Sequence, residues 1–117
     1  MRWALAELRN RQPLWNEPVN QTEAELLAKA FKALGDPVRV RLLSLIAGHR
    51  RAMPVSLMRE EINLSAPAIS HHLKVLRDGG LVQSCRVGTW VYYWLLPSTF
   101  DALTNLLDTS IMPPRLG

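Results

Sequence analysis

The stretch SAPAISHHLKVLRDGGLVQSCRVGTWVYYWL, residues 65–95, decides the fold that this sequence predicts. It begins with Ser65, a residue suited to cap a helix, and carries an apolar stripe at helical spacing as far as the glycine pair Gly79-Gly80. β-branched and aromatic residues then flank Gly88-Thr89, which suits a two-residue type II′ turn. A helix followed directly by a hairpin predicts a winged helix-turn-helix.

The residues before this stretch predict the other helices of such a fold. A helix is expected over residues 22–34, where Thr22 and Glu25 have the spacing of a capping box. Asp36 and Pro37 have the residue types that begin a second helix, and a short helix is expected over residues 56–62. A basic loop joins these last two helices.

The sequence divides into one domain and two short ends. After the hairpin, a last helix is expected over residues 97–110, so residues 22–110 form a mainly α domain with a two-stranded β wing. Residues 1–21 are expected to be an N-terminal extension with room for a short helix, and residues 111–117 a tail.

The composition is that of a globular protein. The chain has 117 residues, of which 48% are hydrophobic and 21% charged, which supports one core and excludes a mostly disordered chain. The formal charge of +4 is compatible with a polyanionic partner. A single cysteine forms no intrachain disulfide, and no apolar run is long enough to span a membrane. We therefore expect a cytoplasmic protein without membrane contact.

The helix that begins after Ser65 has the surface of a DNA-reading helix. Side chains near its N-terminus must be small or polar, because bulky ones would hold the backbone away from the bases in the major groove. The residues that meet this requirement are Ser65, Ala66, Pro67, Ala68, Ser70 and His71. Lys74 would reach a phosphate, and Arg86 and Thr89 would contact the DNA backbone or the adjacent minor groove. An ordinary solvated helix face is the alternative, and the basic hairpin favours DNA.

Three segments resemble the ArsR/SmtB family of repressors. The segment FKALGDPVRVRLL, residues 31–43, resembles the helix pair of that family, and residues 65–82 resemble its recognition helix. Residues 90–93 are similar to its second wing strand. The resemblance covers roughly residues 22–108. It implies a homodimer that blocks transcription at a double-stranded DNA operator and leaves it when an effector binds.

The first and last helices of the domain carry more apolar residues than a three-helix core needs. The expected homodimer interface on them consists of Leu27, Phe31, Phe100, Leu103 and Leu107.

The sequence departs from the family at both of its usual metal sites. Residues 53–60 lack the Cys-x-Cys pattern of the arsenic-type site, and the last helix offers Asp101 and Asp108 without histidine. Soft metals need thiolate or imidazole ligands, so we expect no metal site and no cofactor. The effector stays open: thiol-based or metalloid sensing through Cys85, a non-metallic inducer, or none. A lone cysteine in a strand is otherwise a small hydrophobic residue.

Four tryptophans leave a further alternative open. They indicate core and interface packing or, alternatively, an apolar effector pocket between the N-terminal extension and the core; they are Trp3, Trp15, Trp90 and Trp94.

The sequence gives less support to two other function classes than to a DNA-binding repressor. An enzyme is not expected, because the chain shows no Ser/His/Asp set, phosphate-binding glycine loop or metal triad. A winged helix that contacts only protein or RNA would keep the fold but would not need Lys74 and Arg86 on the groove-facing side.

Overall fold

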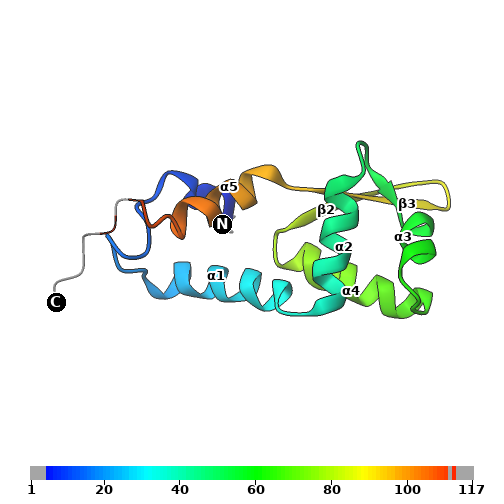
Figure 1. The fold of residues 1–117 in the computed structure, drawn as a ribbon, viewed down its shortest axis with the longest axis horizontal. Coiled ribbons are helices and arrows are strands. Elements are labelled where there is room, and N and C mark those ends of the chain that lie inside the picture. The colour runs from blue at the N-terminus through cyan, green and yellow to red at the C-terminus, as the bar shows by residue number, and fades with distance from the viewer. Residues whose placement is uncertain (1–4, 111, 113–117) are drawn as a thin grey trace.

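The computed structural model describes residues 5–110 and residue 112, and it confirms the predicted winged helix-turn-helix. Most of the chain is helical, and one small antiparallel sheet lies beside the helices (Figure 1). The elements in chain order are the 3-10 helix η1 (Leu5–Asn10), α1 (Gln21–Leu34), α2 (Pro37–Gly48), β1 (Met53–Pro54), α3 (Val55–Glu61), α4 (Ala66–Asp78), β2 (Val82–Val87), β3 (Trp90–Leu95) and α5 (Pro97–Leu106).

Helix α4 forms where the sequence predicted it. The Ser65 hydroxyl oxygen accepts a hydrogen bond from the backbone N–H of Ala68 at 3.2 Å, which satisfies one of the unpaired donors of the first turn. The apolar stripe of Ile69, Leu73 and Leu76 is fully buried and forms the centre of the core. Gly80 ends the helix with φ +79°, a left-handed conformation that glycine adopts without steric cost. The recognition helix therefore presents one face to the core and leaves the opposite face exposed.

The sheet contains one strand that the sequence did not predict. Its order is β1-β3-β2, all antiparallel, with Met53 opposite Tyr93 and Ser84 opposite the same tyrosine on the other side. β1 has only two residues and lies in the expected basic loop, so it shows no alternation of apolar and polar residues. The hairpin turn is as predicted: Gly88 has φ +61°.

The N-cap of helix α1 lies two residues before the predicted one, so the choice of Thr22 and Glu25 was wrong. Asn20 is the N-cap: its side-chain oxygen accepts from the N–H of Glu23 at 2.9 Å, and the Glu23 carboxylate accepts from the N–H of Asn20 at 3.0 Å. Glu23 is also held by the guanidinium of Arg11 at 2.8 Å, an interaction that only the folded chain provides. The expected cap of α2 is confirmed, since Asp36 accepts from the N–H groups of Val38 and Arg39.

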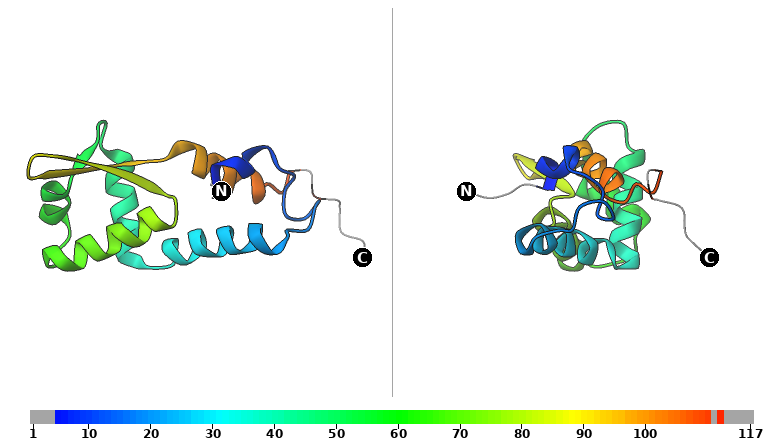
Figure 2. Two further views of the ribbon diagram at one scale, coloured as in Figure 1. Left: turned by 180° about the vertical axis from the view of Figure 1, so that it is seen from behind. Right: turned by 90° about the vertical axis from the view of Figure 1, so that its left-hand side faces the viewer.

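The N-terminal segment is packed against the last helix of the domain. η1 lies beside α5 in both directions of view, and Leu5 and Leu8 are buried there (Figures 1 and 2). The backbone N–H of Leu14 donates to the carbonyl of Leu106 at 3.0 Å, and the indole N–H of Trp15 donates to the carbonyl of Asp108 at 2.8 Å. The expected short helix in the extension is therefore present, as a 3-10 helix. Trp3, one of the four tryptophans considered for an effector pocket, lies outside the described residues.

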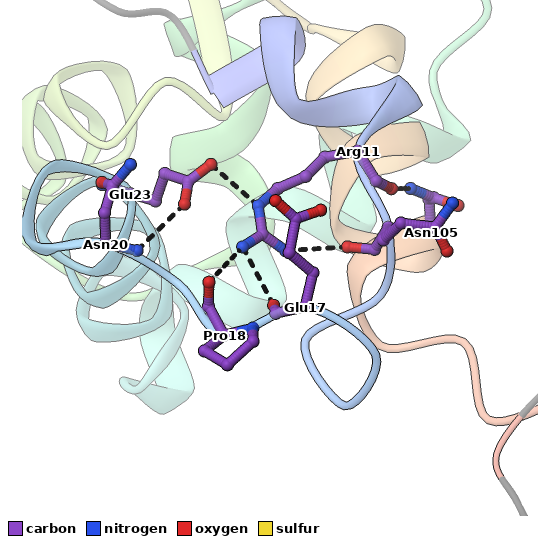
Figure 3. A network of polar contacts seen from close by, with 7 residues as sticks. Arg11, Glu17, Pro18, Asn20, Glu23 and Asn105 are labelled. Atoms are coloured by element: carbon purple, nitrogen blue, oxygen red, sulfur yellow. Dashed lines mark hydrogen bonds and ion pairs between the residues drawn. The ribbon is translucent and has the colours of Figure 1, made fainter.

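One arginine joins this segment to α1. Arg11 donates to the carbonyl oxygens of Glu17 and Pro18 and pairs with Glu23, while its own carbonyl accepts from the side-chain amide of Asn105 (Figure 3). The hydrogen bond that Arg11 donates holds the pKa of Glu23 below its ordinary value of 4.5, as do the N–H of Asn20 and the Arg11 charge, although burial opposes the shift.

Helix α5 ends at Leu106, four residues before the end expected from its apolar pattern. The side chain of Asp108 accepts from the N–H of Ser110 at 2.9 Å, a local hydrogen bond that competes with helix continuation. That bond holds the pKa of Asp108 below its usual value.

The molecule is elongated, with two unlike ends. The helix-turn-helix and the sheet lie at one end, and α1, α5 and η1 lie at the other (Figure 1). The radius of gyration is 16.3 Å, whereas a compact domain of this length would have about 13 Å. Helices α1 and α5 therefore extend the core toward one end of the molecule instead of folding back over the helix-turn-helix.

Candidate nucleic-acid interface

The exposed face of α4 carries the polar residues that the sequence singled out. Pro67, Ser70, His71 and Lys74 are exposed, and the hydroxyl of the exposed Ser65 is engaged in the helix cap. The two alanines of the set, Ala66 and Ala68, are half-buried. Their side chains are small, so no bulky group projects beside these polar residues. A face with small residues in the first turn and a lysine one turn later has the shape and chemistry that base reading requires.

The hairpin places its predicted residues beside the first turns of α4. Arg86 and Thr89 are exposed, and both line a groove of about 710 Å³ together with Ala66 and Ser70. We call this the wing groove; its walls are α3, α4 and the β2–β3 hairpin. The fold thus brings together two residues of the reading helix and two of the wing that lie about twenty positions apart in the sequence.

The wing groove is also lined by residues that were not among the predicted site residues. Arg59 of α3, Arg77 of α4 and Trp90 of β3 line it with the predicted ones. Arg77 follows the helical spacing of Ala66 and Ser70, a signal that was present in the sequence. The position of Arg59 depends on how α3 packs, which no local pattern reports.

Cys85 is exposed and unpaired, and it lies in the wall of the same groove. Its side chain is therefore not part of the core of this chain. Among residues 5–110, no group of three His, Cys, Asp or Glu side chains is placed so that it could hold a metal ion.

His72 lies on the inner side of the recognition helix α4, next to the connection between α1 and α2. Its Nδ1 is 3.2 Å from Nη1 of Arg39 and 4.0 Å from a carboxylate oxygen of Asp36. Burial of Asp36 acts to raise the pKa of its carboxyl, but the N–H groups of Arg39 and Val38 and the neighbouring charges outweigh it, so the pKa lies below its ordinary 3.8. The adjacent His71 points to solvent, as expected for a residue that faces DNA.

The predicted dimer residues divide into two groups. Leu27 and Leu103 are 4% and 6% exposed, so the core of one chain already covers them. Phe31 and Leu107 are 39% and 43% exposed, and Phe100 is half-buried. The exposed members lie on the elongated end of the molecule, on α1 and immediately after α5.

Comparison with known proteins places these features in a family. The sequence profile of the bacterial regulatory proteins of the arsR family matches residues 36–84. An HTH-type transcriptional regulator of Methanocaldococcus jannaschii is 36% identical over 84 residues, which cover 72% of this chain and 93% of that protein. The arsenic resistance transcriptional regulator ArsR2 of Pseudomonas putida is 43% identical over 81 residues, which cover 69% of this chain and 70% of that protein.

A solved structure shows the same fold. The ArsR-like transcriptional regulator from Rhodococcus sp. RHA1 has a TM-score of 0.66 and 28% sequence identity, over 76% of this chain and 80% of that one. None of the helices in the described part of this chain is long and apolar enough to cross a membrane.

Proposed function

This chain belongs to the arsR family of bacterial regulatory proteins, and from that premise we propose that it represses transcription by binding an operator as a homodimer. The observation that supports this most directly is the exposed polar face of α4 beside the basic hairpin. An α-helix fits the major groove of B-DNA, where every base pair shows its own pattern of donors and acceptors.

The exposed residues divide by chemistry into two roles. Ser70 and His71 carry short polar groups near the helix N-terminus and are proposed to read base edges. Lys74, Arg86 and Thr89 are proposed to bind phosphate and sugar, which fixes the register of the protein without reading sequence. Ser65, Ala66, Pro67 and Ala68 keep the first turn narrow enough for close approach.

The shape of the molecule supports a homodimer. The side chains of Phe31, Phe100 and Leu107 form apolar surface that a single chain leaves partly exposed to solvent at one end of the molecule. An operator with two-fold symmetry is bound by a protein with two-fold symmetry. Leu27 and Leu103 support this surface from the core side. Isologous pairing would cover it and set the spacing between the two reading helices.

We propose further that the protein is cytoplasmic, is not an enzyme and holds no cofactor. Its effector is not an ion bound at the usual family positions, because residues 53–60 hold no cysteine and Asp101 and Asp108 have no histidine beside them. A non-metallic inducer, thiol chemistry at Cys85, or binding without an inducer remain as the three forms of this proposal.

A footprint on the DNA upstream of the gene, followed by affinity measurements, tests the DNA-binding role. Ser70→Ala and His71→Ala should each cost about 1–3 kcal/mol on the footprinted site and less on random duplex. Lys74→Ala and Arg86→Ala should weaken binding to both duplexes by the same factor. They should also make the binding constant depend less steeply on salt concentration. Equal losses on both duplexes for all four variants would contradict the assignment of base readers, and absence of any salt-dependent duplex binding would contradict the function.

A further inference from the structure

The wing groove has more positive charge than the reading face of α4. Three arginines from three different elements line it: Arg59 of α3, Arg77 of α4 and Arg86 of β2. No acidic residue is among its lining residues, which also include the hydroxyl groups of three serines, a threonine and a tyrosine. A groove with three guanidinium groups and no carboxylate attracts an anion with several negative charges.

The three guanidinium groups are free to bind such an anion. Within the described part of the chain, none of them forms an ion pair, and Arg77 makes one hydrogen bond, to the hydroxyl of Ser84 at 3.2 Å. By contrast, Arg11 and Arg39 are engaged by carboxylates and backbone carbonyls in the interior of the fold. Since guanidinium groups bind phosphate oxygens through paired N–H donors, unengaged arginines in a groove indicate a phosphate ligand.

The rest of the lining suits a nucleic-acid strand better than a small anion. Trp90, which is 53% exposed, presents an aromatic surface on which a sugar or a base can pack. Ala66 and Ser70 belong both to the groove and to the first turns of the reading helix. The backbone of a strand whose bases meet those turns must pass close to them, and the groove is continuous with them.

We propose that the wing groove holds the sugar-phosphate backbone of one strand of the operator, with Arg59 and Arg77 as phosphate contacts in addition to Arg86. This inference rests on the proposed DNA-binding function and adds two residues, Arg59 of α3 and Arg77 of α4, to the proposed DNA contacts. Bound DNA then lies between the helix-turn-helix and the wing, so that α3, α4 and the hairpin contact one strand together. Cys85, exposed in the wall of the groove, is covered by that strand.

The salt dependence of operator binding measures the phosphate contacts. Each lost contact lowers the slope of log K against log salt by about 0.9, and hence by about 2 for a dimer that loses one contact per protomer. Arg59→Ala and Arg77→Ala should each show this fall. Arg50→Ala removes an equally exposed arginine from the loop before β1, outside the groove, and should leave the slope unchanged. Arg59→Lys and Arg77→Lys keep the charge and should keep the slope.

The thiol of Cys85 gives a second, independent readout on the unmutated protein. Operator duplex at saturating concentration should slow alkylation of Cys85 by iodoacetamide at least tenfold, whereas inorganic phosphate at millimolar concentration should not. If the wild-type protein binds no duplex, the proposed function fails. If it binds with a steep salt slope while both alanine variants behave as Arg50→Ala does and Cys85 reacts as fast as in free protein, only the groove proposal fails. Protection by phosphate alone would overturn it in favour of a small-anion site.

Discussion

Nη1 of Arg39 lies 3.2 Å from Nδ1 of His72, and this contact joins helix α2 to the recognition helix α4. The same guanidinium donates to the carbonyl of Ala33 at 2.7 Å and to that of Lys32 at 3.2 Å, at the end of α1. A guanidinium has only donors, so a hydrogen bond between these two atoms requires the neutral His72 tautomer that accepts through Nδ1. One side chain thus ties three helices to one another and fixes how α4 sits in the fold.

Removal of His72 should affect both stability and DNA binding. His72→Ala leaves one Arg39 donor without its acceptor, which should lower the free energy of unfolding by about 1 kcal/mol and weaken operator binding, because α4 is held less firmly. His72→Asn keeps an acceptor and should recover part of both losses. Urea unfolding and fluorescence anisotropy with labelled operator measure the two effects.

The neighbouring histidine provides the control for this prediction. His71→Ala removes an exposed side chain, so unfolding should change by less than about 0.5 kcal/mol while operator affinity falls. If His71→Ala destabilised the protein as much as His72→Ala, the distinction between a reading histidine and a positioning histidine would be lost.

Charge placed on the exposed part of the proposed dimer surface should separate the subunits. Leu107→Asp and Phe31→Asp alter side chains that one chain leaves exposed, so they should yield a folded monomer in sedimentation velocity at micromolar concentration. Val40→Asp changes an even more exposed apolar residue, in α2, and should leave the dimer intact. Leu103→Asp is a poor test, because it places a charge in the core of one chain. A wild-type protein that sediments as a monomer would refute the interface.

Acid should remove the contribution of Glu23 to stability. Because its pKa is lowered in the folded chain, the folded state binds a proton less readily than the unfolded state does. The stability that Glu23 supplies is therefore complete above its ordinary pKa of 4.5 and is lost as the pH falls through the lower folded value. The difference in melting temperature between wild type and Glu23→Gln should be large at neutral pH and small in acid.

Glu60→Gln gives the comparison for this acid effect. Glu60 is an exposed residue of α3 whose carboxylate has no hydrogen bond within the described residues, so its replacement should alter the melting temperature little at either pH. A Glu23→Gln difference that stays constant or grows toward acid would show that the pair with Arg11 does not lower the pKa of Glu23 as described.

Metal ions should not release the protein from its operator through the usual family sites. Zinc, cadmium, copper(I) and arsenite, titrated into the complex under reducing conditions, should leave it bound, since the sequence has a single cysteine and no histidine after His72. Release that disappears in Cys85→Ser would make that thiol a sensor. Stoichiometric release that survives both Cys85→Ser and removal of residues 1–20 would reveal a metal site at other residues.

Local patterns were sufficient for the recognition helix and the wing. Ser65, the stripe through Leu73 and the glycine pair at 79–80 each act within a few residues, so the helix and its ends follow from the sequence alone. The choice between Asn20 and Thr22 as the cap of α1 could not be made in this way. Both residue types cap helices well and both have a glutamate three positions later, and the pairing of Glu23 with Arg11 favours the first.

The remaining differences arise from packing between distant segments. An apolar residue at helical spacing faces either the core or a partner, so the pattern did not separate the buried Leu27 from the exposed Phe31 four residues later. The wing groove likewise exists only when α3 is packed beside the hairpin, which brings Arg59 next to Arg86. Composition predicted a basic surface but could not place it there.

The hydrogen bond from Trp15 to Asp108 spans 93 positions of the chain, and it orders events during synthesis. The N-terminal segment leaves the ribosome first but has no surface to pack on until α5 has emerged, whereas α3, α4 and the hairpin are neighbours in the sequence and can assemble as they appear. A nascent or truncated chain that ends before residue 97 would thus carry the DNA-reading half with only the α1 part of the surface proposed to pair. Such fragments would compete with the full-length protein for operator DNA as single subunits, with the low affinity of one subunit.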